Sequence, residues 1–421
     1  MPVFLVVLIF ALTLSVIFIR PKGLNEAWAT VVGGSLMLAL RLVTPMEALQ
    51  TVLQGASVLL FLLGLLILSE LLRVSGFFEW AAVHAARAAG GDGRALYRNV
   101  FLLGALTTAC LSLDTTAVIL TPIVLSFVGR LKLNTLPFLM ACGFVANTGS
   151  LLLPISNLTN LLFVSAFHWS FPRFVLIMAM PQAVALLVNY KLFRLLFRRD
   201  LPERFAGGDF PGPSELVPDQ PYFRGAVCVL AFVLVGYFVG SLVGVQPYIV
   251  TLAGCAALLL WGSWRKRVTV GILRDISWPI FPFVIGLFIV VKGVENTGVG
   301  QLVRGAVQTS GHSALAQTIT AAIGAGIGSN IVNNIPMALL AISSLKAGTS
   351  QYAQYGALLG CNLGPNLTVA GSLATMLVIT SARKYGENVG ARDLFAVGLR
   401  VTPVVTLAAA IGLYLSLLIF K

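Results

Sequence analysis

The chain has 421 residues, of which 58% are hydrophobic and only 10% are charged. Because soluble domains are about 25% charged, this composition excludes soluble enzymes, nucleic-acid-binding proteins and disordered scaffolds, and it indicates a polytopic membrane protein. The net charge of +13 then reflects Lys and Arg at cytoplasmic helix ends rather than a nucleic-acid partner. The five cysteines stand singly and the three histidines are scattered, so no disulfide framework, metal site or cofactor is predicted.

The first apolar run, Val3 to Ile19, is followed by the basic segment Arg20-Pro21-Lys22-Gly23. A cleaved signal peptide carries its positive charge before the apolar run, so this run is predicted to be a retained transmembrane helix. About twenty apolar residues cross the hydrocarbon core of a bilayer. By that measure, single spans are predicted near residues 25–40, 51–72, 172–193, 222–243, 247–262, 279–293 and 394–420, with short amphipathic interfacial segments near 75–89 and 296–308.

Four apolar stretches are too long for one span, and each has polar residues in its middle. Residues 99–129 and 314–345 are predicted to be re-entrant hairpins, because each half has only about fourteen apolar residues. Residues 135–167 and 352–382 are predicted to be broken helices. Irregular backbone at membrane depth is expected only where it is buried or lines a wet cavity, so the four breaks are expected to surround a transport site. The alternative is four kinked but continuous helices.

The basic residues favour one topology. If both hairpins re-enter and the N-terminus lies outside, 22 of the 28 Lys and Arg residues fall on one side, which is then cytoplasmic. Both termini are then periplasmic, and the protein is a multi-pass protein of the bacterial inner membrane. The count by itself does not exclude two full crossings for each hairpin.

Each half of the chain then has five crossings and one hairpin, so the second half is inverted relative to the first. The sequence around Asn147 and Asn157 aligns without a gap with the sequence around Asn362 and Ser372. The predicted fold is an all-α polytopic membrane protein of two inverted repeats, with about 10 transmembrane helices plus two re-entrant hairpins and two broken helices. Residues 1–197 form the first repeat, residues 198–221 a Pro-rich cytoplasmic linker, and residues 222–421 the second repeat.

Asp114 is the single carboxylate residue within the four broken stretches. Because an acid inside a membrane is costly, its expected role is functional, as a proton or cation site, and Asp114 is predicted to couple transport to protons. The alternative is a helix cap for the segment that begins at Thr115. The other acids are expected to matter less: Glu70 stands one turn from Arg73 as an interfacial pair of little weight, and Asp275 adjoins a basic residue in a loop.

Uncharged polar side chains cluster at the same breaks, and they are predicted to bind substrate: Thr115, Thr116, Asn147, Ser150, Ser156, Asn157, Asn330, Asn333, Asn334, Asn362, Asn366 and Ser372. Asn160 belongs to the same group of amides. The alternative role for each is hydrogen bonding between helices. With no Lys or Arg in the broken cores, the site suits a small neutral hydroxylated solute, or an anion held by helix N-termini. Cys110, Cys142 and Cys361 lie close to the breaks, where packing is the simpler role and metalloid ligation the alternative.

Several motifs along the whole chain resemble those of the bacterial arsenite and antimonite efflux permeases, the ArsB family within the ion transporter superfamily. The motifs are Arg20-Pro21-Lys22-Gly23-Leu24, Ser75-Gly76-Phe77-Phe78-Glu79-Trp80, Asp114 ahead of Ile119-Leu120-Thr121-Pro122, Ser156-Asn157-Leu158, Asn333-Asn334-Ile335-Pro336, Gly360-Cys361-Asn362-Leu363-Gly364-Pro365 and Gly371-Ser372-Leu373-Ala374-Thr375.

The resemblance implies secondary active efflux of trivalent arsenic and antimony hydroxides in exchange for protons. Some relatives also engage a cytoplasmic arsenite-stimulated ATPase subunit, so the resemblance admits such a partner. The family commonly has Asp where this chain has Asn147 and Asn362, and Asn where it has Leu113. These departures leave Asp114 as the sole obvious proton carrier.

Two other classes of protein are alternatives. A sodium-coupled dicarboxylate carrier or a sodium/proton antiporter could share the same fold, because sodium sites can be built from amides and carbonyls at hairpin tips. An intramembrane hydrolase would need paired Asp residues, a Ser–Lys pair or a His-rich metal site, none of which this sequence offers, so the protein is predicted not to be an enzyme.

Overall fold

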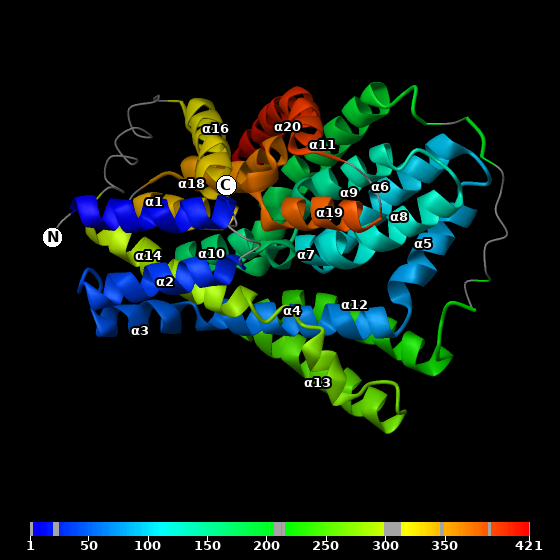
Figure 1. Ribbon diagram of the computed structural model, residues 1–421, viewed down its shortest axis with the longest axis horizontal. Coiled ribbons are helices and arrows are strands. Elements are labelled where there is room, and N and C mark those ends of the chain that lie inside the picture. The colour runs from blue at the N-terminus through cyan, green and yellow to red at the C-terminus, as the bar shows by residue number, and fades with distance from the viewer. Residues whose placement is uncertain are drawn as a thin grey trace.

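The computed structural model describes residues 3–19, 25–201, 203–205, 212, 215–298, 313–345, 349–385 and 389–420. Every regular element in these residues is a helix, and the helices pack into one bundle (Figure 1). The segment Arg20-Pro21-Lys22-Gly23, most of the interfacial segment predicted at 296–308 and part of the linker predicted at 198–221 lie outside the described residues.

The helices of the first half are α1 (Val3–Ile19), α2 (Glu26–Ala39), α3 (Pro45–Gln54), α4 (Ala56–Val74), α5 (Phe77–Arg87), α6 (Gly93–Cys110), α7 (Leu113–Thr115), α8 (Thr121–Arg130), α9 (Leu136–Thr148), α10 (Leu158–Phe167) and α11 (Phe171–Leu196). Those of the second half are α12 (Gln220–Leu242), α13 (Pro247–Trp264), α14 (Ile280–Asn296), α16 (Ala314–Val332), α17 (Asn334–Leu345), α18 (Gln351–Leu363), α19 (Leu373–Lys384) and α20 (Ala391–Ile419). Among the described residues, seven helical segments are long and apolar enough to cross a bilayer.

Both predicted hairpins contain two helical arms separated by a short break. In the first, α6 ends at Cys110, and a continuous helical segment restarts at Leu113. In the second, α16 ends at Val332, Asn333 forms the break, and α17 follows at once. The first arms are longer than the sequence suggested, since α6 has 18 residues and α16 has 19.

The two broken helices have the same local structure. In each, an α-helix of 13 residues, α9 or α18, runs into a 3₁₀ turn, and a second helix begins after an extended residue. That residue is Asn157 (φ −149°, ψ 142°) in the first half and Ser372 (φ −147°, ψ 143°) in the second. In both cases its side chain accepts a hydrogen bond from the backbone two residues later, which ends the break and caps the new helix.

Close helix packing around the breaks depends on small residues. A Cβ atom at Gly286 would lie 2.5 Å from the Thr30 carbonyl oxygen, so α14 and α2 are in backbone contact. A Cβ atom at Gly360 would lie 2.2 Å from the Ala322 carbonyl oxygen, so α18 and α16 are equally close. Small residues allow this close approach of helices in membranes.

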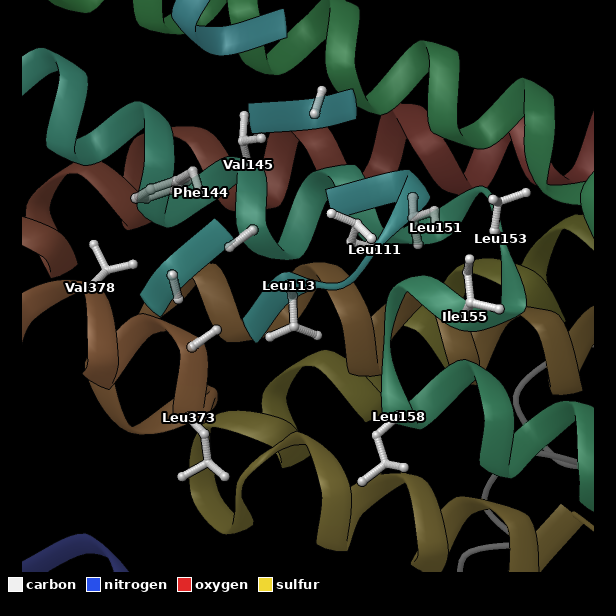
Figure 2. Packing of buried hydrophobic residues seen from close by; sticks show 14 of the residues in the cluster. Leu111, Leu113, Phe144, Val145, Leu151, Leu153, Ile155, Leu158, Leu373 and Val378 are labelled. Atoms are coloured by element: carbon white, nitrogen blue, oxygen red, sulfur yellow. The ribbon is translucent and has the colours of Figure 1, made fainter. Parts of the chain in front are cut away.

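The apolar core joins the breaks of the two halves. Figure 2 shows Leu111 and Leu113 from the first hairpin tip, Leu151 from the first broken helix, and Leu373 and Val378 from the second broken helix around one region. All of these side chains are buried in the same cluster. The polar breaks are therefore embedded in a shared, close-packed apolar core that holds them in place.

A polar contact outside the spans fixes α12 against the end of α13. One carboxylate oxygen of Asp219 accepts a hydrogen bond from the Tyr222 backbone (2.9 Å), and the other contacts Arg265 (2.9 Å) and Arg267 (3.1 Å). The backbone hydrogen bond, with help from the two guanidinium groups, lowers the pKa of Asp219 to about 2.

The depressed pKa makes this contact sensitive to acid. Asp219→Asn keeps the helix cap but loses the charge, so we expect a lower melting temperature at neutral pH. The contribution of the charge is complete above the unfolded-state pKa, about 3.9, and is lost as the pH falls through the folded-state pKa of about 2. The melting temperatures of wild type and variant in detergent should therefore converge below pH 4. A difference that stays constant with pH would contradict this assignment.

Candidate functional site

The turn of the first hairpin carries Asp114. Ser112 is extended, and its hydroxyl accepts a hydrogen bond from the Thr115 backbone (3.1 Å), so Ser112 caps the new helix. Asp114 stands in the first turn of that helix and makes no hydrogen bond or ion pair with any residue that the structure describes. Ser112 therefore fills the capping role considered for Asp114, and the Asp114 carboxylate is available to a solute or a proton.

Hydroxyl groups fix the backbone on both sides of Asp114. The Thr115 hydroxyl hydrogen-bonds to Ser69 of α4 (2.8 Å) and to Ser112 (2.9 Å), and Thr116 hydrogen-bonds to Thr108 of α6 (2.7 Å). The residues that follow, Thr116–Leu120, form a π-helical segment before α8 begins. Such segments interrupt regular helix geometry and are frequent at functional sites.

Asp114 lines a cavity of about 250 Å³ between the hairpin tip and helices of both halves. The rest of its wall is built from the start of α2, the last third of α4, the residues before α14, and α19. Four helical segments therefore begin at this cavity: the hairpin segment at Leu113, α2 at Glu26, α14 at Ile280 and α19 at Leu373. Their N-terminal backbone dipoles stabilise negative charge there.

Three further acidic residues line the same cavity, and sequence reasoning missed all of them: Glu26, Glu70 and Asp275. The Glu70 side chain is only 10% exposed, and Arg73 binds it through two nitrogen atoms. The same guanidinium group lies 3.6 Å from an Asp275 carboxylate oxygen. Arg73 therefore joins α4 to the loop before α14 at the edge of the cavity, which is more than the minor interfacial pair expected from sequence. The available signal was Glu70 itself, an acid near the end of an apolar helix.

Loss of Arg73 should destabilise the protein, because it leaves a nearly buried carboxylate without its partner. We expect Arg73→Gln to lower the free energy of unfolding by about 2 kcal/mol, and the double variant Glu70→Gln/Arg73→Gln to lower it less. Thermal melting in detergent measures both effects. Arg224→Gln is the control, since Arg224 is exposed and makes no ion pair with a described residue. Equal losses in the single and double variants would contradict this account.

The amides of the two broken helices form a buried network that joins the two halves of the chain. The Asn362 carbonyl accepts hydrogen bonds from the Asn157 amide (2.7 Å) and from the Thr159 hydroxyl. The Asn362 amide donates to the Asn160 carbonyl (2.6 Å). Asn362 therefore holds three side chains of the first half through a single amide group.

A second set of amide contacts lies beside the first. The Asn147 amide donates to the Asn366 carbonyl (2.9 Å) and to Thr375 (3.1 Å), and the Asn366 amide donates to Thr148 (3.0 Å). Asn147 is 0% exposed and Asn366 is 3% exposed. These contacts are the kind expected of hydrogen bonding between helices, which was the alternative role for each amide.

The second hairpin tip carries backbone strain. Asn333 has a φ of 74° and a ψ of 157°, a region that favours glycine, and its amide donates to the Ala370 carbonyl (3.1 Å). The side-chain oxygen of the neighbouring Asn334 is buried and has no hydrogen-bond partner among the described residues. Asn330 donates to the Gly364 carbonyl (2.8 Å), which ties this tip to the second broken helix.

The structure separates the predicted site residues into two groups. Asp114 and Thr115 line the cavity, whereas the other predicted residues do not. Thr116 lies beside them in the π-helical segment, and the remaining hydroxyl groups contact the backbone: Ser150 donates to the Asn147 carbonyl, Ser156 donates to the Ala109 carbonyl, and Ser372 accepts from the Ala374 amide. Cys110, Cys142 and Cys361 also lie outside the cavity wall.

A second cavity, of about 590 Å³, lies farther along α4 and α14, which also line the first cavity. On α4, Leu66 and Glu70 face the first cavity and Val58 faces the second; on α14, Phe283 faces the first and Phe288 the second. Parts of α10 and α17 complete its wall, together with the Lys292–Glu295 ion pair (3.3 Å). The two cavities are therefore separated by about two helical turns of α4 and one of α14.

Comparisons with known proteins agree with this architecture. The chain covers most of the solved structure of the Alcanivorax borkumensis YdaH transporter, with a TM-score of 0.58, 15% sequence identity and 90% coverage of each chain. At this identity the likeness concerns the fold alone. It confirms the predicted fold class, an all-α membrane protein with the ion-transporter fold.

Sequence comparisons are more specific. Residues 5–417 match the family model described as ArsB, arsenical pump membrane protein. The chain is 32% identical over 416 residues to the arsenical pump membrane protein of Escherichia coli (strain K12), covering 95% of this chain and 96% of that protein. It is 26% identical over 437 residues to the putative arsenical pump membrane protein of Bacillus subtilis (strain 168), covering 97% and 98%. The chain therefore belongs to the ArsB family of arsenical pump membrane proteins.

Proposed function

We propose that the protein exports trivalent arsenic and antimony as neutral hydroxides from the cytoplasm in exchange for protons. The observation that carries this proposal is the cavity at Asp114: an unpartnered carboxylate at a hairpin turn, with helix N-termini around it and no Lys or Arg among the described residues of its wall. A neutral trihydroxide has no charge to strip of water, so hydroxyl and backbone groups can replace its hydration shell at modest cost.

Proton exchange rests on the same carboxylate. A protonated Asp114 leaves the cavity free of its charge, and an ionised Asp114 can accept hydrogen bonds from the hydroxyl groups of the substrate. Alternation between these two states would link proton entry to metalloid exit. The amides at the breaks, including Asn147, Asn157, Asn330, Asn333, Asn334, Asn362 and Asn366, with Ser150, Ser156 and Ser372, then act on the substrate only if the hairpin tips move apart during transport.

The charge of the cavity wall argues against a dicarboxylate as substrate. Arg73 contacts Glu70 and Asp275, but the Asp114 carboxylate has no partner among the described residues, so in its ionised form it would repel an entering dianion. Arsenate, an anion at neutral pH, should be excluded for the same reason. A cytoplasmic ATPase subunit, as the family resemblance admits, would be an additional partner on the basic side of the membrane.

The test of this function is expression in a bacterium that lacks its own arsenite pump. We expect growth in arsenite and antimonite but not in arsenate, and accumulation of arsenite by everted vesicles that collapses when the proton gradient is dissipated. No resistance to either metalloid, together with sodium-dependent uptake of succinate, would instead support the dicarboxylate carrier.

The proposed topology places both termini in the periplasm, with residues 1–197 and 222–421 as two inverted repeats joined by a cytoplasmic linker at 198–221. It rests on the uneven distribution of Lys and Arg between the two sides. Single cysteines at the exposed positions Lys266 and Arg41, in a background without native thiols, should react with impermeant reagents from opposite faces of the membrane. Labelling of both positions from the same face would rule out this topology.

A further inference from the structure

A basic cavity lies between α6 and α11, away from the Asp114 cavity. It has a volume of about 350 Å³ and is lined by Arg94, Lys191, Arg194, Leu195, Arg198 and Leu201. Four of these six residues are cationic, and no acidic residue is among them. Like charges this close together repel one another, so the cavity favours an anionic occupant.

The cations at the end of α11 and just beyond it are not neutralised by the part of the protein that the structure describes. Lys191, Arg194 and Arg198 are exposed and make no ion pair with a described residue. Arg94 contacts Glu203 at 3.1 Å, but Glu203 is 82% exposed, so this pair is weak. Three positive charges in the cavity therefore remain unbalanced within the part of the chain that the structure describes.

The walls of the cavity are held by stacked aromatic rings. Tyr97, one turn from Arg94, stacks on Tyr190 with ring centroids 6.4 Å apart. Tyr190 precedes Lys191 and also packs on Phe101 (5.4 Å). This contact fixes α6 against α11 directly beneath the cations, so the spacing of the cavity walls does not depend on an occupant.

The exposed faces of both helices continue from the cations into leucine. On α11, Leu187 is 55% exposed and stands one turn before Lys191 on the same face. On α6, Leu102 and Leu106 are 54% and 62% exposed and follow Arg94 and Arg98 at four-residue spacing. In a membrane protein such leucines face acyl chains, so the occupant meets positive charge at one end and lipid-facing surface at the other.

We propose that this cavity binds the headgroup of an anionic phospholipid, with its acyl chains along the leucine-bearing faces of α6 and α11. A phosphodiester headgroup supplies the missing negative charge, and the adjoining apolar surface distinguishes a lipid from a free anion. Basic pockets between transmembrane helices bind anionic headgroups in this way. The site is independent of the transport function proposed above.

Native mass spectrometry of the full chain in detergent tests this site. We expect phosphatidylglycerol to bind more tightly than phosphatidylcholine with the same acyl chains. The triple variant Lys191→Gln/Arg194→Gln/Arg198→Gln should lose about fivefold in phosphatidylglycerol affinity for each charge removed, or about 100-fold in total. The control is the triple variant Arg224→Gln/Lys266→Gln/Arg392→Gln, which removes the same charge at exposed positions outside the cavity. It should change the affinity for phosphatidylglycerol by less than about twofold.

Three results would overturn the proposal. One is equal binding of the two lipids by the wild type, and another is equal losses in the two triple variants. The third is displacement of phosphatidylglycerol by millimolar inorganic phosphate, which would make this a site for a soluble anion. If the triple variant does not fold, as judged by circular dichroism, the single variant Arg194→Gln replaces it, with an expected fivefold loss.

Discussion

Asp114→Asn should abolish the gradient-driven accumulation of arsenite in everted vesicles while leaving exchange of arsenite across the membrane measurable. Asparagine preserves the size of the side chain and the first turn of the helix, but it cannot take up or release a proton at physiological pH. Because Asp114 has no hydrogen-bond partner in the described structure, the substitution leaves no other group unpaired, so folding should be nearly unaffected. The expected result is that transport is no longer coupled to protons, while the amount of folded protein stays the same.

The matched control is Asp200→Asn, which removes the same charge from an exposed residue that lines none of the three cavities. It should accumulate arsenite like the wild type. Counterflow of labelled arsenite, driven by unlabelled arsenite in the absence of a proton gradient, separates coupling from binding. If Asp114→Asn still concentrates arsenite against its gradient, the proton is carried elsewhere.

Asn362→Ala should have the largest effect on stability of the substitutions considered. It leaves the Thr159 hydroxyl and the Asn160 carbonyl without their partner and the Asn157 amide with only its longer contact to Ser150 (3.4 Å), and all three groups are buried. Each buried group without a partner costs about 1–3 kcal/mol, so we expect a loss of about 3 kcal/mol or more in unfolding free energy. Transport should fall at least tenfold, because a loss of about 1.4 kcal/mol in the stability of the transport-competent packing corresponds to a factor of ten.

Asn362→Asp is the informative comparison. Aspartate keeps an acceptor for Asn157 and Thr159, and in its protonated form its hydroxyl can still donate to the Asn160 carbonyl. It is also the residue that the family commonly has at this position, as the sequence resemblance implies. We therefore expect a smaller loss of melting temperature than in Asn362→Ala and measurable transport. A melting temperature of Asn362→Ala equal to that of the wild type would show that the network does not hold the two halves together.

The sequence alone was sufficient to predict most apolar helical segments and the approximate positions of the four breaks. Hydrophobic length and the cost of polar backbone in a membrane are local properties, so interruptions near Asp114 and at Asn333 could be recognised without knowledge of the packing. The structure places the first break at Leu111 and Ser112, just before the helix that carries Asp114. Asp114 could be singled out in the same way, because an acid within an apolar stretch is costly wherever the stretch lies. The family likewise followed from motifs spread along the chain, and the comparisons confirm it.

Only the tertiary structure decided which of these residues share a site. Asn157 and Asn362 are 205 positions apart, and their hydrogen bond forms because α10, which begins just after Asn157, packs against α18. Glu70 and Asp275 reach the Asp114 cavity only because α4, α14 and the first hairpin tip converge there. Sequence periodicity specifies which face of a helix is apolar, but not which distant helix covers that face. The partners of a buried amide or carboxylate are therefore set by the three-dimensional packing.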